Sequence, residues 1–197
     1  GPEAVCKYLN QVRDQYDNKT LPSALKGGRV VLLGEEKDAS LNNKYIDGLK
    51  ILCKENLHWE FCSNPKHIPF VTETCKKCPK EMLFVLDHML PNDGGDDFEV
   101  WSKNISNLAD EVPNSYCKLG AAEEWGCQNC SKYLEFAIDT FGYDRVMYES
   151  NWFVSEIYGC EYDATAKLLY NVLRSKNASD IEMQKVFHLN AKKVYRL

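Results

Sequence analysis

The stretch Asp144-Arg-Val-Met-Tyr-Glu-Ser-Asn-Trp-Phe-Val154 decides the fold of this chain. Its portion at residues 145–148 is a short apolar run of the kind that forms a buried strand. It is the last of five such runs, which begin about 30 residues apart, the length of one strand followed by one helix. The runs cover residues 29–33, 57–62, 82–88, 115–119 and 145–148.

The segments between these runs have apolar residues at helical spacing. The apolar faces comprise Val5, Tyr8, Leu9, Val12 and Tyr16 in one segment, and Phe98, Trp101, Ile105 and Leu108 in another. Ser179 and Glu182 predict a capping box that opens the last helix. Strands that alternate with helices in this way predict an α/β fold with a parallel sheet.

Length and charge limit what the chain can be. Its 197 residues predict a single domain over residues 1–197 with a substantial core. The formal net charge is −5 and no basic run occurs, so we expect no nucleic-acid partner. The longest apolar stretch, Met82–Leu90, is too short to cross a bilayer, so no membrane span is expected.

Nine cysteines and four Asn-x-Ser/Thr sequons favour a secreted glycoprotein with disulfide bonds. The sequons begin at Asn18, Asn104, Asn129 and Asn177. The alternative is a cytoplasmic protein whose cysteines are buried free thiols.

Two cysteine pairs, Cys75-Lys-Lys-Cys78 and Cys127-Gln-Asn-Cys130, have the spacing of zinc ligands. However, Cys75 and Cys78 continue the helical spacing of Ile68, which predicts that they lie on the buried face of a helix. Disulfides, including a local Cys127–Cys130 bond, and buried thiols remain alternatives to zinc. A titration of free thiols in denaturant separates these outcomes.

The Asp144–Val154 stretch, with Asn190-Ala-Lys-Lys-Val-Tyr195 after it, resembles the closing signature of metal-dependent amidohydrolases. The branch concerned contains sugar-lactone hydrolases such as L-fuconolactonase. Earlier blocks match the same family in order, namely Gly28-Arg-Val-Val-Leu32, Tyr45-Ile-Asp-Gly-Leu-Lys-Ile-Leu52, His58-Trp-Glu-Phe61, Phe84-Val-Leu-Asp-His88 and Ser115-Tyr-Cys-Lys-Leu119. The resemblance implies a partial (β/α)8 TIM-type barrel of about five parallel strands with covering helices, lacking the first three strands.

A barrel without its first strands has two consequences. The family's first strand carries a His-x-His pair, whereas no two of His58, His67, His88 and His188 are separated by one residue. We therefore expect no metal and no other cofactor. Five strands also cannot close a barrel, so we expect a homodimer or a partner chain to cover the open sheet edges. Light scattering that finds a strict monomer would count against this expectation.

The closing strand departs from the family at the catalytic aspartate, which is Asn151 here. An amide cannot act as a base at neutral pH and is a poor ligand for a catalytic divalent ion. Glu149 should share a strand face with Asn151 but lie about 7 Å away, so it should not replace the acid. These changes predict that the parent activity is lost.

Other candidate residues follow from the same alignment. His88 ends the third run, where the resembled enzymes have their active site, and Asp87 beside it could tune it as a general base. Lys118, Trp152 and Glu60 could bind a sugar-like ligand through charge and stacking.

Three functional hypotheses remain. The first is a degenerate amidohydrolase-like protein without metal-dependent hydrolase activity, which acts as a binding or structural protein and forms a dimer. The second is a hydrolase of sugar lactones or related small esters and amides, which uses His88 in a metal-independent or partner-completed site. The third is a zinc-stabilised module. A panel of sugar lactones assayed with and without chelator, together with metal analysis, discriminates among them.

Overall fold

The computed structural model describes residues 1–16, 21–88, 98–121 and 130–197. The described strands form one parallel sheet in the order of the sequence, as expected for an α/β fold that is part of a βα barrel. They are β1 (Gly27–Val31), β2 (His58–Cys62), β3 (Phe84–Asp87), β4 (Ser115–Leu119) and β5 (Val146–Tyr148).

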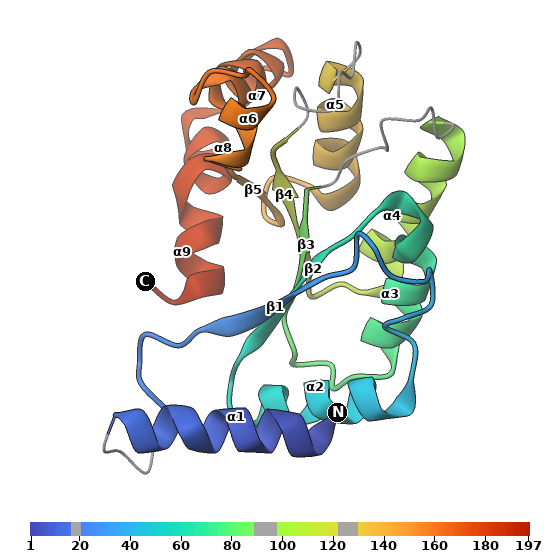
Figure 1. Cartoon of the computed structure of the whole chain (residues 1–197). Coiled ribbons are helices and arrows are strands. Elements are labelled where there is room, and N and C mark those ends of the chain that lie inside the picture. Colours follow the sequence, from blue (N-terminus) through green and yellow to red (C-terminus); the bar gives the residue numbers. More distant parts are fainter. Residues whose placement is uncertain (17–20, 89–97, 122–129) are drawn as a thin grey trace.

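Helices lie along both faces of the sheet (Figure 1). They are α1 (Pro2–Gln15), α2 (Asn43–Lys54), η1 (Pro65–His67), α3 (Ile68–Lys76), α4 (Phe98–Glu111), α5 (Cys130–Phe141), α6 (Val154–Ile157), α7 (Ala164–Ser175), α8 (Asp180–Gln184), the π-helical turn η3 (Lys185–Leu189) and α9 (Asn190–Tyr195). The predicted capping box is present, because Ser179 and Glu182 bond reciprocally at the start of α8.

The main core fills the space between the sheet and helices α2 to α5. Alternate residues of each strand enter it, such as Phe61 of β2 and Phe84 of β3, whose rings stack at 6.1 Å. Trp101 of α4 is fully buried there, as its helical spacing predicts. This face of the sheet is largely apolar, and its packing positions the strands.

The opposite face of the sheet, called the inner face below, is covered at the amino ends of its strands by α9 (Figure 1). Val194 of α9 packs there against Val85, Tyr116 and Met147 of three successive strands. The end of the chain then reaches the start of β1, where the Arg196 guanidinium donates to the Lys26 carbonyl at 2.9 Å. The carboxyl ends of the strands therefore hold the remaining, polar part of the inner face.

The bounds of β1 and β3 differ most from the expected ones. β1 begins at Gly27 instead of Arg29, because its glycines make room for the next strand: a Cβ at Gly27 would lie 2.6 Å from the His58 ring. β3 ends at Asp87 instead of His88, whose φ of 52° is incompatible with a strand. The His88 side chain therefore points from a bend, not from the strand itself.

The cysteines correct one expectation. Among the described cysteines, no disulfide joins Cys6, Cys53, Cys62, Cys75, Cys78 or Cys117, which are free thiols. Cys75 is buried on α3 and Cys78 is buried just beyond its end, where both pack as small apolar side chains. Cys127 lies outside the described residues, and the described residues contain no group of three metal-ligating side chains.

Two of the four sequons begin at described residues. Asn104 is half-buried on α4, and Asn177 is exposed beyond the end of α7, whereas Asn18 and Asn129 lie outside the described residues. Glycosylation and secretion stay predictions. Among the described helices, none has the length and apolar character to cross a membrane.

Candidate functional site

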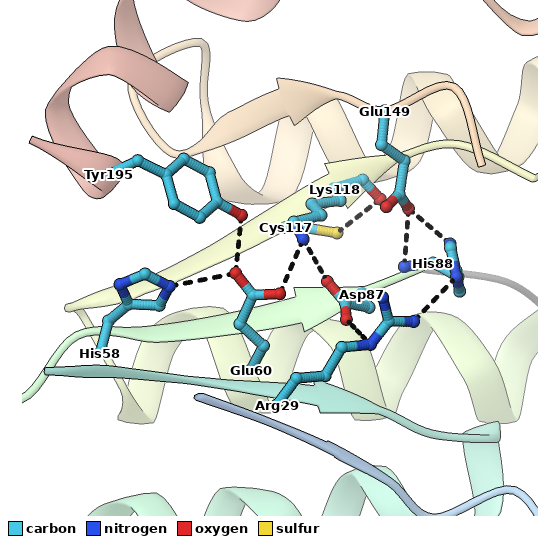
Figure 2. A network of polar contacts seen from close by, with 9 residues as sticks. All are labelled: Arg29, His58, Glu60, Asp87, His88, Cys117, Lys118, Glu149 and Tyr195. Carbon is cyan, nitrogen blue, oxygen red and sulfur yellow. Dashed lines mark hydrogen bonds and ion pairs between the residues drawn. The ribbon is translucent and has the colours of Figure 1, made fainter. Parts of the chain in front are cut away.

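A network of charged side chains occupies the carboxyl ends of the strands on the inner face (Figure 2). Arg29 of β1, Glu60 of β2, Asp87 of β3 and Lys118 of β4 each contribute, and Glu149 follows β5 directly. Side chains alternate along a strand, so β3, β4 and β5 turn Val85, Tyr116 and Met147 inward, and a charged residue, Asp87, Lys118 or Glu149, follows two positions later. The sheet thus builds an ionic layer above an apolar one.

Lys118 is the centre of this network. Its Nζ lies 2.9 Å from Glu60 Oε2 and 2.6 Å from Asp87 Oδ1. The second oxygen of Asp87 lies 2.7 Å from Nε of Arg29. The Asp87 side chain is fully buried, and Lys118 is 12% exposed. A single ammonium group therefore pairs with two carboxylates that have little contact with water.

The two carboxylates beside Lys118 differ in their pKa. Burial disfavours charge on Glu60, but the hydrogen bond from His58, the Lys118 charge and the bond from the Tyr195 hydroxyl lower its pKa to about 2. The two hydrogen bonds measure 3.1 and 2.6 Å. Burial raises the pKa of Asp87 to about 6; Lys118 opposes this, while Glu60 and Glu149 add to it.

His88 is held by Glu149. One Glu149 oxygen, Oε1, accepts from the His88 backbone N–H at 2.9 Å and lies 2.6 Å from its Nδ1. The other ring nitrogen, Nε2, faces Arg29 at 3.5 Å. Burial alone would lower the His88 pKa, but hydrogen bonds with Cys62 and Glu149 raise it to about 10. At neutral pH this side chain is therefore an imidazolium and not a base.

Cys62 completes the network at the end of β2. It pairs in register with Asp87, and its side chain is buried near the positively charged side chains of His88 and Arg29. Burial opposes the thiolate, yet the two cationic partners outweigh it and lower the pKa of this thiol. The opposite shift occurs at Cys75 and Cys117, where burial raises the pKa.

The structure brings together only some of the residues expected at the site. Lys118 and Glu60 form an ion pair, and His88 lies nearby, but its partner is Glu149 where Asp87 was expected. Trp152 is 57% exposed and its indole N–H donates to Glu156 at 3.1 Å, outside the network. The ligand-binding roles of Lys118, Trp152 and Glu60 stay predictions.

Glu149 corrects the expectation drawn from strand alternation. β5 ends at Tyr148, and Asn151 has a φ of 47°, so Glu149 and Asn151 are not two residues of one strand face. Glu149 bends toward His88 over Gly120, where an added Cβ would lie 2.2 Å from the Glu149 Cγ. A glycine at this position is therefore a condition for the Glu149–His88 contact.

Four members of the network were not expected from the sequence: Arg29, His58, Cys62 and Tyr195. A signal for three of them was present. His58 and Cys62 lie two residues on either side of Glu60, and Arg29 pairs with Glu60 in the parallel register of β1 and β2. Tyr195 comes from the C-terminal helix, and no local pattern places it opposite Glu60.

The raised pKa of His88 makes a prediction about pH. Its folded-state value of about 10 exceeds the ordinary 6.5, so its stabilising contribution is complete below pH 6.5 and disappears as the pH rises through 10. His88→Gln should lower the free energy of unfolding most below pH 6.5 and least above pH 10. Urea unfolding of both proteins across this range measures the difference. A difference that does not vary with pH would contradict the Glu149–His88 ion pair.

Comparison with known proteins gives one family. A family model described as amidohydrolase matches residues 23–197. The protein y4mH of Sinorhizobium fredii is 28% identical over 167 residues, which are 82% of this chain and 54% of y4mH. The chain thus spans about half the length of this curated relative.

Two solved structures share the fold. An amidohydrolase from Burkholderia multivorans, crystallised with bound zinc, has a TM-score of 0.82 and 22% identity; the match covers 95% of this chain and 69% of that one. A probable 2-pyrone-4,6-dicarboxylic acid hydrolase from Acinetobacter baumannii, with citric acid bound, has a TM-score of 0.73 and 14% identity, covering 96% and 78%. At these identities the likeness concerns the fold alone.

Proposed function

This chain belongs to the amidohydrolase family, and from that premise we propose that its inner-face network binds a small carboxylate ligand without a divalent metal ion. The chain has a hydrolase-type fold, and its network lies at the carboxyl ends of the strands, where βα-barrel enzymes have their sites. The proposal retains the hypothesis of an amidohydrolase-like binding protein that lacks metal-dependent hydrolysis.

The observation that carries this proposal is the position of Lys118. Its Nζ takes the place between Glu60 and Asp87 that a divalent cation would need, at 2.9 and 2.6 Å from their oxygens. A metal ion there would meet a like charge at close range in a poorly solvated layer. His88 offers no free nitrogen, because Glu149 holds Nδ1 and Arg29 faces Nε2. The described side chains of the network are therefore not arranged to coordinate a divalent metal ion.

The same charges favour an anionic ligand. Arg29 is 44% exposed, and its guanidinium lies beside the His88 imidazolium at the solvent side of the network. A guanidinium presents five N–H donors in a planar fork that matches a carboxylate. The citric acid bound by the Acinetobacter relative supports the choice of a carboxylate as the ligand class.

Calorimetry with citrate in the presence of chelator tests the proposal. We expect wild-type protein to bind citrate, and Arg29→Gln to weaken binding about ten-fold, the loss of roughly one charge-assisted hydrogen bond. Arg174→Gln serves as the control, because Arg174 is exposed near the end of α7, away from the sheet's inner face. Equal affinities in the two variants, or binding that requires added zinc, would contradict the proposal.

A further inference from the structure

The two edges of the described sheet differ in what lies beside them. β5 forms one edge, where η3 packs against it and the Asn190 side-chain amide donates to the Val146 carbonyl at 2.7 Å. β1 forms the other edge and, within the described sheet, pairs with β2 alone. The outer side of an edge strand presents main-chain donors and acceptors that can pair with a further strand. The β1 edge is therefore the place where the described sheet can be extended.

The hydrogen bonds between β1 and β2 show which main-chain groups point outward. The Lys26 carbonyl accepts from the His58 N–H at 3.1 Å, and the Leu32 N–H donates to the Cys62 carbonyl at 2.8 Å. Lys26 and Leu32 are even-numbered, and successive residues of a strand direct their main-chain groups to opposite sides. The odd-numbered residues of β1 therefore direct their N–H and C=O groups away from β2. These residues are Gly27, Arg29 and Val31.

An apolar cavity of about 370 Å³ lies along this edge. Its walls include Val5 and Tyr8 of α1 and Gly28 of β1, together with the Trp59 side chain of β2. The Trp59 ring occupies the space that a side chain at Gly28 would need. Its indole N–H donates to the Tyr45 hydroxyl at 2.8 Å, which fixes the ring in place. α1 and the β1 edge thus form the two sides of a groove, called the edge groove below, with an aromatic wall that is already positioned.

The inner-face side of the same edge is cationic. The Arg29 side chain is 44% exposed there and binds Asp87 through Nε at 2.7 Å. The His88 imidazolium lies beside its guanidinium. Side chains alternate between the two faces of a strand, so a strand beside β1 would have two kinds of neighbour. Side chains on its outer face would enter the cavity, and those on its inner face would meet the Arg29 charge.

We propose that the edge groove binds an extended segment of another protein in which apolar residues alternate with an acidic residue. The segment adds to the sheet as a strand, held by main-chain hydrogen bonds to β1. Its apolar side chains fill the cavity, and its acidic side chain faces Arg29. A second copy of β1 would instead bring a like charge to Arg29, which is unfavourable between paired strands. The inference concerns the sheet edge and does not depend on the carboxylate-binding proposal.

Fluorescence anisotropy with two labelled peptides tests the charge preference. The first probe is acetyl-Thr-Leu-Glu-Leu-Thr-amide with a fluorescein label, and the second has Lys in place of Glu. We expect saturable binding of the Glu peptide to wild type and about ten-fold weaker binding of the Lys peptide, because Arg29 attracts one and repels the other. In Arg29→Gln the two peptides should bind alike. Equal affinities of the two peptides for wild type, or no binding of the Glu peptide, would overturn the inference.

A substitution in β1 tests the main-chain pairing. The Val31 N–H points away from β2, so Val31→Pro removes a donor that the described sheet does not use. We expect it to weaken binding of the Glu peptide about ten-fold, through one lost hydrogen bond and the bulk of the ring. Val31→Thr is the matched control, because it retains the N–H and a β-branched side chain, and it should bind like wild type. Urea unfolding checks that both variants are folded.

Hydrogen exchange of wild type locates the bound peptide without any substitution. Amide protection that increases in β1 when the Glu peptide is added, and not in β5, is the expected result. Protection confined to other segments would overturn the inference. Sedimentation of the free protein identifies the competing occupant: a dimer that takes up no peptide would assign the edge to a second copy and would likewise overturn the proposal.

Discussion

Replacing Lys118 with methionine should lower the free energy of unfolding by about 3–5 kcal/mol, the usual cost of removing one partner from a buried ion pair. Methionine retains most of the side-chain length but leaves Glu60 and Asp87 facing each other without the ammonium group between them. Both carboxylates are nearly or fully buried, so water cannot replace the lost charge. One of them must then bind a proton in the folded state.

Urea unfolding of Lys118→Met against wild type measures this effect. The matched control is Lys167→Met on α7, because Lys167 also pairs with two carboxylates but does so in solvent, where such pairs contribute little. Adding Asp87→Asn to Lys118→Met should recover part of the loss, since one uncompensated charge is removed. Equal stability of Lys118→Met and wild type would show that the network is not a buried one.

Replacing Asn190 with alanine should lower the free energy of unfolding by about 2–4 kcal/mol, because one buried and one partly buried carbonyl group lose their donor. The Asn190 amide nitrogen donates at 2.7 Å to both Tyr143 and Val146, which flank the start of β5. β5 pairs with β4 alone in the described sheet, so the Val146 carbonyl on its free side relies on this side chain. The same contact fixes the start of α9, which carries Tyr195 to Glu60.

Thermal or urea unfolding of Asn190→Ala provides the measurement. Asn171→Ala on α7 is the control, because Asn171 is an exposed helical residue and its replacement should leave stability nearly unchanged. If Asn190→Ala were as stable as Asn171→Ala, then α9 would be held by its apolar contacts alone. The predicted loss of stability would instead show that the Asn-Ala-x-x-x-Tyr segment has a structural role. Its Asn190 holds β5, and its Tyr195 contacts Glu60 of the network.

The fold was largely predictable from the sequence because its signals are local. The five apolar runs all appear as strands, and β4 occupies the predicted residues 115–119. Where the bounds of a strand differ from the predicted ones, the cause lies in contacts or backbone conformation that its own apolar pattern does not show. β1 starts earlier because its glycines face the side chains of β2, and β3 ends early because His88 adopts a left-handed backbone conformation.

The candidate site was less predictable because its contacts join residues far apart in the chain. Lys118 and Glu60 were expected to bind a ligand, but only the sheet register shows that they bind each other. Strand spacing predicted that Glu149 lies too far from Asn151 to replace the missing acid. However, β5 ends at Tyr148, and the backbone after it is no longer extended. The Glu149 carboxylate therefore contacts His88. The cysteine count suggested disulfides, whereas described cysteines such as Cys62, Cys75 and Cys117 are free thiols.

The most direct test of the metal-free account measures unfolding free energy with and without zinc, in wild type and in Glu60→Gln. An ion bound at about 100 times its dissociation constant would stabilise the folded state by ~2.7 kcal/mol. Because the Lys118 ammonium group already lies between Glu60 and Asp87, we predict that zinc changes the unfolding free energy of both proteins equally. Any binding of zinc to thiols is common to the two. A zinc stabilisation that is present in wild type and lost in Glu60→Gln would contradict the account.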